Sequence, residues 1–406
     1  MVIRDGGVSL WNVQMKRLFV VLLFGCLTGC LTVPRDATVL NEAAAASVPE
    51  FPNARFNADD PTLAGRLETD MRATAARTPA TGPYQILALS GGGADGAFGA
   101  GVLIGWTERG DRPQFNVVTG VSTGALIAPF AFLGPDYDAR LRDAYTSGAA
   151  AKLTHKRGLY AAFTPGIFQA GELRDLVARY IDDDLLAAIA REHLKGRRLF
   201  VATTNLDSQE GVVWDLGAIA LEAQTHPYKR TAARELFCKV LVASASVPGA
   251  FAPVMIETDT VGDQNPDALG PKGHPLQEMH VDGSVTLPFF ILPESMLDWT
   301  VPADLRHGGH VYVLVNGKIN PAYAVTKNNA VTIAARSLET ITKAQARVTL
   351  VALKAFAERN DLSMSVTAMP DDFIDGGMLA FDTESMNKVF DKGYAIGLSP
   401  QNWTDK

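Results

Sequence analysis

The sequence has few cysteines, no excess of basic residues and only moderate amounts of glycine and proline. Three cysteines in 406 residues cannot form a disulfide framework. The 37 basic and 44 acidic side chains give a net charge of -7, which excludes the general electrostatic footprint of a nucleic-acid-binding protein. The 36 glycines and 22 prolines are too few for a collagen-like or low-complexity chain. Since 47% of the residues are hydrophobic, the sequence predicts a globular protein with a large core.

The N-terminal segment has the pattern of a targeting signal. Lys16 and Arg17 precede a short apolar run, which is followed by small residues and then by Cys30. The run is shorter than the roughly 20 residues of a membrane-spanning helix, which favours a cleaved signal peptide. Its end, Leu-Thr-Gly-Cys, resembles the bacterial lipobox, so Cys30 is expected to carry lipid; an ordinary secretory signal is the alternative. Either Met1 or Met15 is the true start, since the pattern is complete from Met15.

The predicted lipid anchor implies a location. In bacterial lipoproteins, a residue other than aspartate after the lipidated cysteine implies sorting to the outer membrane, and this residue is Leu31. We therefore expect a protein of the bacterial cell envelope that is anchored through Cys30 in the outer membrane. Because the chain as a whole is acidic, the lipid, and not attraction to anionic headgroups, is expected to hold it at the membrane.

The composition divides the chain into three parts. Residues 1–29 are predicted to be the signal peptide, and residues 30–82, rich in Ala, Pro, Thr and Asn, to be a tether. Residues 83–406 are predicted to form one catalytic domain with its motif-bearing core at 84–290. Cys238 lies in an apolar segment and is expected to be a buried thiol without a catalytic role.

Regular patterns begin at residue 84. Apolar runs at 84–89 and 116–119 predict two strands, and each is followed by a glycine-containing loop and a helical pattern. Two strand–loop–helix units in succession predict a parallel strand pair and an α/β fold. A long helix is predicted at 331–358, and its apolar stripe is expected to pack in the core and not on a membrane; the stripe comprises Leu338, Ile341, Val348, Val351 and Phe356.

Ser122 lies in the sequence Gly-Val-Ser-Thr-Gly, between a predicted strand and a predicted helix. This is the context of the GxSxG nucleophile elbow, in which Gly120 and Gly124 allow a sharp turn that presents the serine hydroxyl to a substrate. The partial positive charge at the start of the following helix favours negative charge that develops beside Ser122.

A second glycine cluster follows the first strand. Backbone N–H groups of Gly91, Gly92 and Gly93 at the start of a helix are suited to bind an oxyanion. The spacing of Gly91, Gly93 and Gly96 also matches a dinucleotide-binding fingerprint, which requires an acidic residue about 20 positions later, at the end of the second strand. Asp111 has nearly the right spacing but precedes that strand. A phosphate-binding P-loop is disfavoured because no Gly-Lys-Ser/Thr follows.

A nucleophilic serine needs a base, and Asp282 is a candidate at the end of a predicted strand, followed by Gly283. The glycine loop, the elbow and this Asp-Gly turn, in this order, resemble the patatin-like phospholipase family. The segment 243–254 resembles the family's segment before the aspartate. The similarity covers about residues 84–284.

The resemblance implies a three-layer α/β/α fold with a mostly parallel central sheet. It implies that Ser122 is the nucleophile, that Asp282 accepts its proton, and that the amides of Gly91–Gly93 form the oxyanion hole. It further implies a lipid acyl hydrolase acting on carboxylic esters of membrane lipids through an acyl-enzyme, with no cofactor and no metal. Two residues depart from the family pattern: Asp95 stands where Arg or Lys is common, and Ser284 follows the Asp-Gly pair. Asp95 casts doubt on the headgroup preference.

Alternatives remain open at this point. A Ser-His-Asp triad would use His307 or His310 with Ser122 and Asp282. A membrane-tethered binding lipoprotein with a lapsed active site is a different class of function, which Asp95 alone suggests. The apolar run at 287–292 either lines an acyl groove or forms a buried strand. The headgroup, chain length, positional preference and oligomeric state do not follow from the sequence.

Overall fold

A computed structural model describes most of the predicted catalytic domain and parts of the segment before it. The described residues are 35–37, 47–60, 62–77, 82–154, 166, 168, 170–259, 275–306, 308–326, 328, 330–374, 376–401 and 403–405. The predicted signal peptide, the predicted lipidation site Cys30, Leu31 and His307 lie outside these residues.

The described strands form one central sheet of eleven strands. Its middle is parallel, in the order β5, β4, β3, β9, β10. These strands are β3 (Tyr84–Leu89), β4 (Val117–Val121), β5 (Arg198–Asn205), β9 (Gly309–Val315) and β10 (Leu362–Ala368). The flanking strands are β1 (Asp36–Ala37), β2 (Arg55–Asn57), β6 (Glu210–Asp215), β7 (Val254–Glu257), β8 (Leu276–Asp282) and β11 (Thr404–Asp405).

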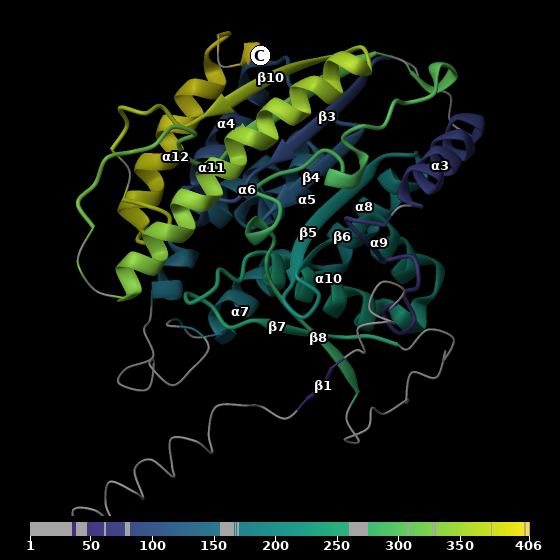
Figure 1. Ribbon diagram of the computed structural model, residues 1–406, viewed down its shortest axis with the longest axis horizontal. Coiled ribbons are helices and arrows are strands. Elements are labelled where there is room, and N and C mark those ends of the chain that lie inside the picture. The colour runs from purple at the N-terminus through teal and green to yellow at the C-terminus, as the bar shows by residue number, and fades with distance from the viewer. Residues whose placement is uncertain are drawn as a thin grey trace, which may run out of the picture.

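Helices cover both faces of the sheet (Figure 1). The larger core contains residues of α4 (Gly96–Arg109), α5 (Thr123–Leu133), α6 (Asp138–Thr146), α7 (Ala170–Tyr180), α8 (Asp183–Leu194), α9 (Leu216–Thr225), α10 (Arg230–Ser244) and α12 (Thr383–Leu398). The smaller core contains residues of α11 (Ala330–Arg359). A further helix, α3, spans Leu63–Arg77. Short 3-10 helices are η1 (Gly93–Asp95), η2 (Pro135–Tyr137), η3 (Ala149–Thr154), η5 (Pro227–Lys229), η6 (Gly283–Val285), η7 (Glu294–Met296) and η8 (Ala303–Leu305).

The alternation of side chains along the strands creates these two cores. In β3, Leu87 and Leu89 belong to the larger core, whereas Ala88 between them belongs to the smaller one. In β9, Leu314 and Val313 divide in the same way. Both faces of the middle strands are buried, as expected for parallel strands with helices on each side. The predicted three-layer α/β/α architecture with a mostly parallel sheet is confirmed.

The helix predicted at 331–358 is present as α11, and Figure 1 shows it lying across the near face of the sheet. The prediction that its whole apolar stripe packs in the core is wrong. Phe356 is buried, but Ile341, Val348 and Val351 are 62%, 70% and 72% exposed. The helix has apolar side chains on two arcs, and the arc that contains Leu353 and Phe356 is the one that meets the sheet.

The segment predicted to be a tether contributes to the folded domain. Phe51 and Leu63 are buried, and β2 pairs with β6 in antiparallel register from Arg55 to Asn57. Its polar composition conceals these contacts, because the apolar side chains that it buries are few and widely spaced. Residues 287–291 of the apolar run are buried and Leu292 is partly buried, but the run at 287–292 forms no strand.

Two further observations bear on the sequence predictions. Cys238 is buried, as predicted, and burial raises the pKa of its thiol to about 11. Among the residues that the structure describes, none of the helices combines the length and the apolar character that a membrane span requires.

Candidate active site

Ser122 occupies a sharp turn between β4 and α5. Its backbone has φ 55° and ψ -125°, a region that non-glycine residues rarely adopt, and α5 begins at the next residue. The turn brings two backbones together, because a Cβ atom on Gly124 would lie 2.5 Å from the carbonyl oxygen of Leu89. The structure therefore places Ser122 at the carboxyl end of a central strand and at the start of a helix, where the sequence predicted it.

Asp282 reaches Ser122 because β4 and β8 share one edge of β5. Strand β4 pairs with β5 as far as Val121, which lies opposite Ala202. Strand β8 takes over the same edge in antiparallel direction, beginning with Asp282 opposite Thr203. The two strands therefore end at adjacent positions of β5, although 160 residues separate Ser122 and Asp282 in the sequence.

The two oxygens of the Asp282 carboxylate have different surroundings. Oδ1 accepts hydrogen bonds from the backbone N–H of Ser284 at 2.8 Å and from its hydroxyl at 2.6 Å. Oδ2 is buried and has no hydrogen-bond partner with good geometry among the described residues. Ser122 is nevertheless close enough for its hydroxyl to lower the pKa of Asp282. The carboxylate is thus held at one oxygen, while the other remains able to accept a proton.

Burial dominates the acid–base properties of Asp282. The loss of water raises its pKa from 3.8 to about 6, although the hydroxyls of Ser122 and Ser284 and the amide of Ser284 favour the charged form. A carboxyl group with a pKa near 6 is a stronger base than one in water and is still ionised near neutral pH.

The end of α10 and the residues directly after it hold both Ser122 and Asp282. The Ser244 hydroxyl accepts a hydrogen bond from the N–H of Ser122 at 2.9 Å and donates to the carbonyl oxygen of Ala202 at 2.7 Å. Two residues later, the carbonyl oxygen of Ser246 accepts from the N–H of Asp282 at 3.0 Å. Sequence analysis noted this segment only by resemblance; it missed that Ser244 positions the Ser122 backbone.

The glycine loop lies beside Ser122 and contains two available donors. The Gly91 N–H donates to the carbonyl oxygen of Pro288 at 3.3 Å, whereas the N–H groups of Gly92 and Gly93 donate no hydrogen bond within the described residues. The loop permits no side chain at Gly92, where a Cβ atom would lie 2.0 Å from the Asn316 carbonyl oxygen. Downstream, Gly96 opens α4.

Asn316 supports this loop and was missed by sequence analysis. Its N–H donates to the Ser90 hydroxyl at 2.8 Å and its side-chain amide to the Ser90 carbonyl oxygen at 2.7 Å. The available signal was its place directly after β9, because the carboxyl ends of parallel strands share one edge of the sheet.

Ser122 lies where two cavities meet. An apolar cavity extends from Ser122 between α5, α7 and α10, and its walls include Phe130, Leu173, Val177 and Leu241. A wider cavity opens on the other side and has polar as well as apolar walls. Its polar walls include Ser90, Asp95, Ser284, Asn316 and Lys343. A molecule with an apolar chain and a polar group could place the chain in the apolar cavity and the polar group in the wider one. The bond that joins the two parts would then lie at Ser122.

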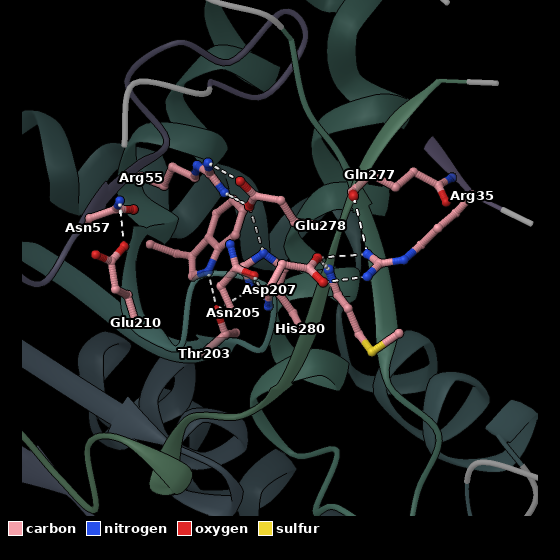
Figure 2. A network of polar contacts seen from close by, with 12 residues as sticks. Arg35, Arg55, Asn57, Thr203, Asn205, Asp207, Glu210, Gln277, Glu278 and His280 are labelled. Atoms are coloured by element: carbon pink, nitrogen blue, oxygen red, sulfur yellow. Dashed lines mark hydrogen bonds and ion pairs between the residues drawn. The ribbon is translucent and has the colours of Figure 1, made fainter. Parts of the chain in front are cut away.

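A buried polar network stabilises the start of β8 (Figure 2). The Arg55 guanidinium donates to both oxygens of Glu278, at 3.0 Å for Nη2. Trp214 Nε1 donates to the Thr203 hydroxyl oxygen at 2.8 Å. The Thr203 hydroxyl in turn donates its proton to His280 Nδ1 at 2.9 Å. His280 Nε2 then donates to Glu278 at 3.1 Å. Burial lowers the pKa of His280, so this chain of donors contains a neutral imidazole.

The network is connected to the candidate site through the sheet. His280 precedes Asp282 by two residues on β8, and Thr203 is the β5 residue paired with Asp282. Because Arg55 comes from β2, the segment before the predicted domain helps to fix the strand that carries Asp282. Sequence analysis gave no indication of this network, since its members lie far apart in the chain.

His310 does not complete a Ser-His-Asp triad. It lies near the start of β9, where its ring stacks on Tyr312 at 4.2 Å and its Nε2 contacts the Ser365 hydroxyl at 2.8 Å. Ser122 is at the opposite, carboxyl edge of the sheet, about 20 Å away at 3.3 Å per strand residue. His307, the other histidine of this alternative, lies outside the described residues.

The described residues contain no group of three or more His, Cys, Asp and Glu side chains arranged to hold a metal ion.

The sequence profile of the patatin-like phospholipase family matches residues 87–293, slightly more than half of the chain. The chain belongs to this family. The matched region contains the glycine loop, Ser122 and Asp282. Family membership supports lipid acyl hydrolysis as the general activity, with lipids or other esters as substrates.

Solved structures of other proteins resemble the chain at low sequence identity. VipD from Legionella pneumophila is 13% identical with a TM-score of 0.32, over 80% of this chain and 68% of VipD. Human GIVD cytosolic phospholipase A2 is 12% identical with a TM-score of 0.29, over 69% of this chain and 49% of its own. No curated protein matches the sequence.

Proposed function

We propose that this protein hydrolyses carboxylic esters of lipids with a Ser122–Asp282 dyad. The observation that carries the proposal is the position of Ser122 at the junction of an apolar and a partly polar cavity, beside a buried carboxylate with one free oxygen. An ester of a fatty acid has a carbonyl group between its acyl chain and its polar part, and this junction would hold that carbonyl at Ser122.

In the first step the Ser122 hydroxyl attacks the ester carbonyl carbon. Its proton moves to Asp282 Oδ2, which has no other partner among the described residues. The carbonyl oxygen becomes an oxyanion, and the N–H groups of Gly92 and Gly93 stabilise it together with the helix starts behind them. The intermediate then breaks its bond to the alcohol oxygen, which takes the proton from Asp282 and leaves. The acyl group remains on Ser122.

In the second step water hydrolyses the acyl-enzyme. The water oxygen attacks the acyl carbon while Asp282 accepts a proton from the water. The N–H groups of Gly92 and Gly93 bind the second oxyanion. The Ser122 oxygen leaves with the proton held by Asp282, which restores the dyad and releases the carboxylic acid. Of the three glycines predicted to form the oxyanion hole, Gly91 contributes least in this scheme, because its N–H already donates to Pro288.

The location of the protein is a second proposal. We infer that Cys30 carries lipid and tethers the protein to the outer membrane of a two-membrane bacterium, which would keep enzyme and lipid substrate on one surface. The support is the lipobox-like sequence before Cys30 and Leu31 after it. Metabolic labelling with a fatty acid tests it: wild type should be labelled, and Cys30→Ser should not. Label on Cys30→Ser, or none on wild type, would refute the anchor.

Three variants test the dyad. A fluorophosphonate probe should label wild type and the control Ser399→Ala, which changes a serine outside both cavities, and should not label Ser122→Ala. Asp282→Asn keeps the shape of the side chain but cannot accept the proton, so hydrolysis of a p-nitrophenyl ester should fall by about 100-fold or more. Wild type without serine-dependent labelling and without esterase activity would favour the alternative of a membrane-tethered binding lipoprotein with a lapsed active site.

A further inference from the structure

The outer side of α11 carries large apolar side chains that the fold leaves exposed. At about 100° of rotation per residue, they form one stripe along the helix. This stripe contains no charged residue, and we call it the α11 face; it consists of Ile333, Ile341, Ala344, Val348 and Val351.

Exposed apolar residues concentrate around this helix and the cavity openings. Of the twelve large hydrophobic side chains that are exposed in the described part of the chain, eight lie between residues 323 and 379. Four belong to the α11 face. Tyr323 and Ile374 line the wider cavity, Leu379 lines the apolar cavity, and Val325 is close to Tyr323 in the chain. Exposed apolar side chains that concentrate in one part of a molecule are typical of an interaction site.

A row of basic residues borders the α11 face. The helix has five basic and two acidic side chains, a net charge of +3 in a chain whose net charge is -7. The same helical rotation places Arg336, Lys343, Arg347 and Lys354 along one border of the stripe. Arg336 and Lys343 also line the wider cavity that contains Ser122. The basic row therefore lies between the apolar stripe and the candidate active site.

We propose that the α11 face docks on the surface of an anionic lipid bilayer. Apolar side chains would enter the boundary between headgroups and acyl chains, while the basic row would lie at the depth of the phosphates. This inference rests on the proposed function, since a lipid that leaves the bilayer at this helix meets the wider cavity and then Ser122. The charge of the whole chain had argued against attraction to anionic headgroups, but the local charge of α11 has the opposite sign.

Vesicle flotation tests the docking surface without turnover. The protein is the full chain with Cys30→Ser and Ser122→Ala, and the vesicles are phosphatidylcholine with or without phosphatidylglycerol. The protein should bind the anionic vesicles. Ile341→Gln, Val348→Gln and Val351→Gln together should weaken this binding at least about tenfold, or about 1.4 kcal/mol.

Two further variants make the flotation result specific. Arg347→Gln with Lys354→Gln should remove the preference for phosphatidylglycerol. Leu194→Gln with Tyr228→Gln changes exposed apolar residues outside the α11 face and should bind like the parent protein. Circular dichroism checks that each variant is folded, and the single variant Val348→Gln replaces the triple variant if the latter unfolds.

Activity separates this inference from the proposed function. For this test Ser122 is restored, and two rates are measured: hydrolysis of vesicle lipid and hydrolysis of a soluble short-chain ester. The ratio of the first rate to the second should be at least about tenfold lower in the triple variant than in the parent protein. If no ester is hydrolysed by any form, the proposed function fails, whereas flotation still decides the docking surface. Binding by the triple variant equal to that of the parent would overturn the inference. So would a parent protein that ignores vesicles and forms a dimer which the triple variant dissociates.

Discussion

The chemistry proposed for the candidate site depends on one carboxyl group that is shielded from water. Asp282 is buried, and this raises its pKa to about 6 while Ser284 holds its Oδ1. A carboxylate in this condition is more basic than an aspartate in water, and in the proposed mechanism it would accept the Ser122 proton without a histidine between them. The same burial means that ionisation of Asp282 lowers the free energy of unfolding. Two measurable quantities, the rate and the stability, should therefore depend on the ionisation of this one side chain.

The rate should depend on the ionisation of Asp282. Since only the carboxylate accepts a proton from Ser122, kcat/KM for a soluble ester should rise with pH through an apparent pKa of about 6 and level off above it. Ser284→Ala removes one hydrogen-bond donor that favours the charged form of Asp282, so the apparent pKa of this rise in kcat/KM should increase. An apparent pKa near that of an ordinary aspartate, or one that Ser284→Ala does not change, would contradict the role of Asp282 as the proton acceptor.

Stability should show the opposite dependence on pH. Between the ordinary pKa of aspartate and about 6, the folded protein keeps a proton that the unfolded chain has released. The free energy of unfolding of wild type should therefore fall, relative to that of Asp282→Asn, by about 3 kcal/mol as pH rises through this window, and then stay constant. Urea unfolding at several pH values measures it, and parallel curves for the two proteins would refute it.

Strand β8 is the element on which the site depends. It carries Asp282 at one end, and the buried network of Arg55, Glu278 and His280 fixes it nearby. The network joins β8 to β2 and β5, so the position of the carboxylate depends on a segment before the predicted domain. A fold tolerates the loss of both members of a buried ion pair more easily than the loss of one, because the remaining member would be a buried charge without a partner.

Removing one partner of this ion pair should be more harmful than removing both. Arg55→Leu leaves the Glu278 carboxylate buried without its cation, which should cost about 3–5 kcal/mol of unfolding free energy. Arg55→Leu with Glu278→Leu should recover most of this loss in urea unfolding. A double variant that is less stable than Arg55→Leu would show that the network has another role.

In the whole molecule, an apolar cavity and a partly polar cavity meet at Ser122. The helices on one face of the sheet enclose the apolar cavity, whereas α11 on the other side lines the wider one with Leu338, Thr342 and Ala346. Ser122 lies between the two because β4 ends at the edge of the sheet where both layers meet. In the proposed function, the acyl chain and the polar group of a substrate would therefore contact different halves of the fold.

Narrowing the apolar cavity should change chain-length preference. Val177→Phe adds volume to its wall on α7, so kcat/KM for long-chain p-nitrophenyl esters should fall by about tenfold or more, while short-chain esters lose much less. Val254→Phe changes a partly buried valine outside both cavities and serves as the control. An equal loss for all chain lengths would place the acyl chain elsewhere.

The sequence by itself determined the local parts of this protein. The glycines around Ser122, in the glycine loop and in the Asp-Gly turn mark places where a side chain would collide with a neighbouring backbone, so they indicated the fold and the candidate residues. Only the tertiary structure decided how these parts meet: the shared edge of β5 for Ser122 and Asp282, the support from Ser244 and Asn316, and the apolar cavity. It also decided that α11 exposes one of its two apolar arcs. Periodicity reports which residues share a side of an element, but the packing partner determines which side is covered.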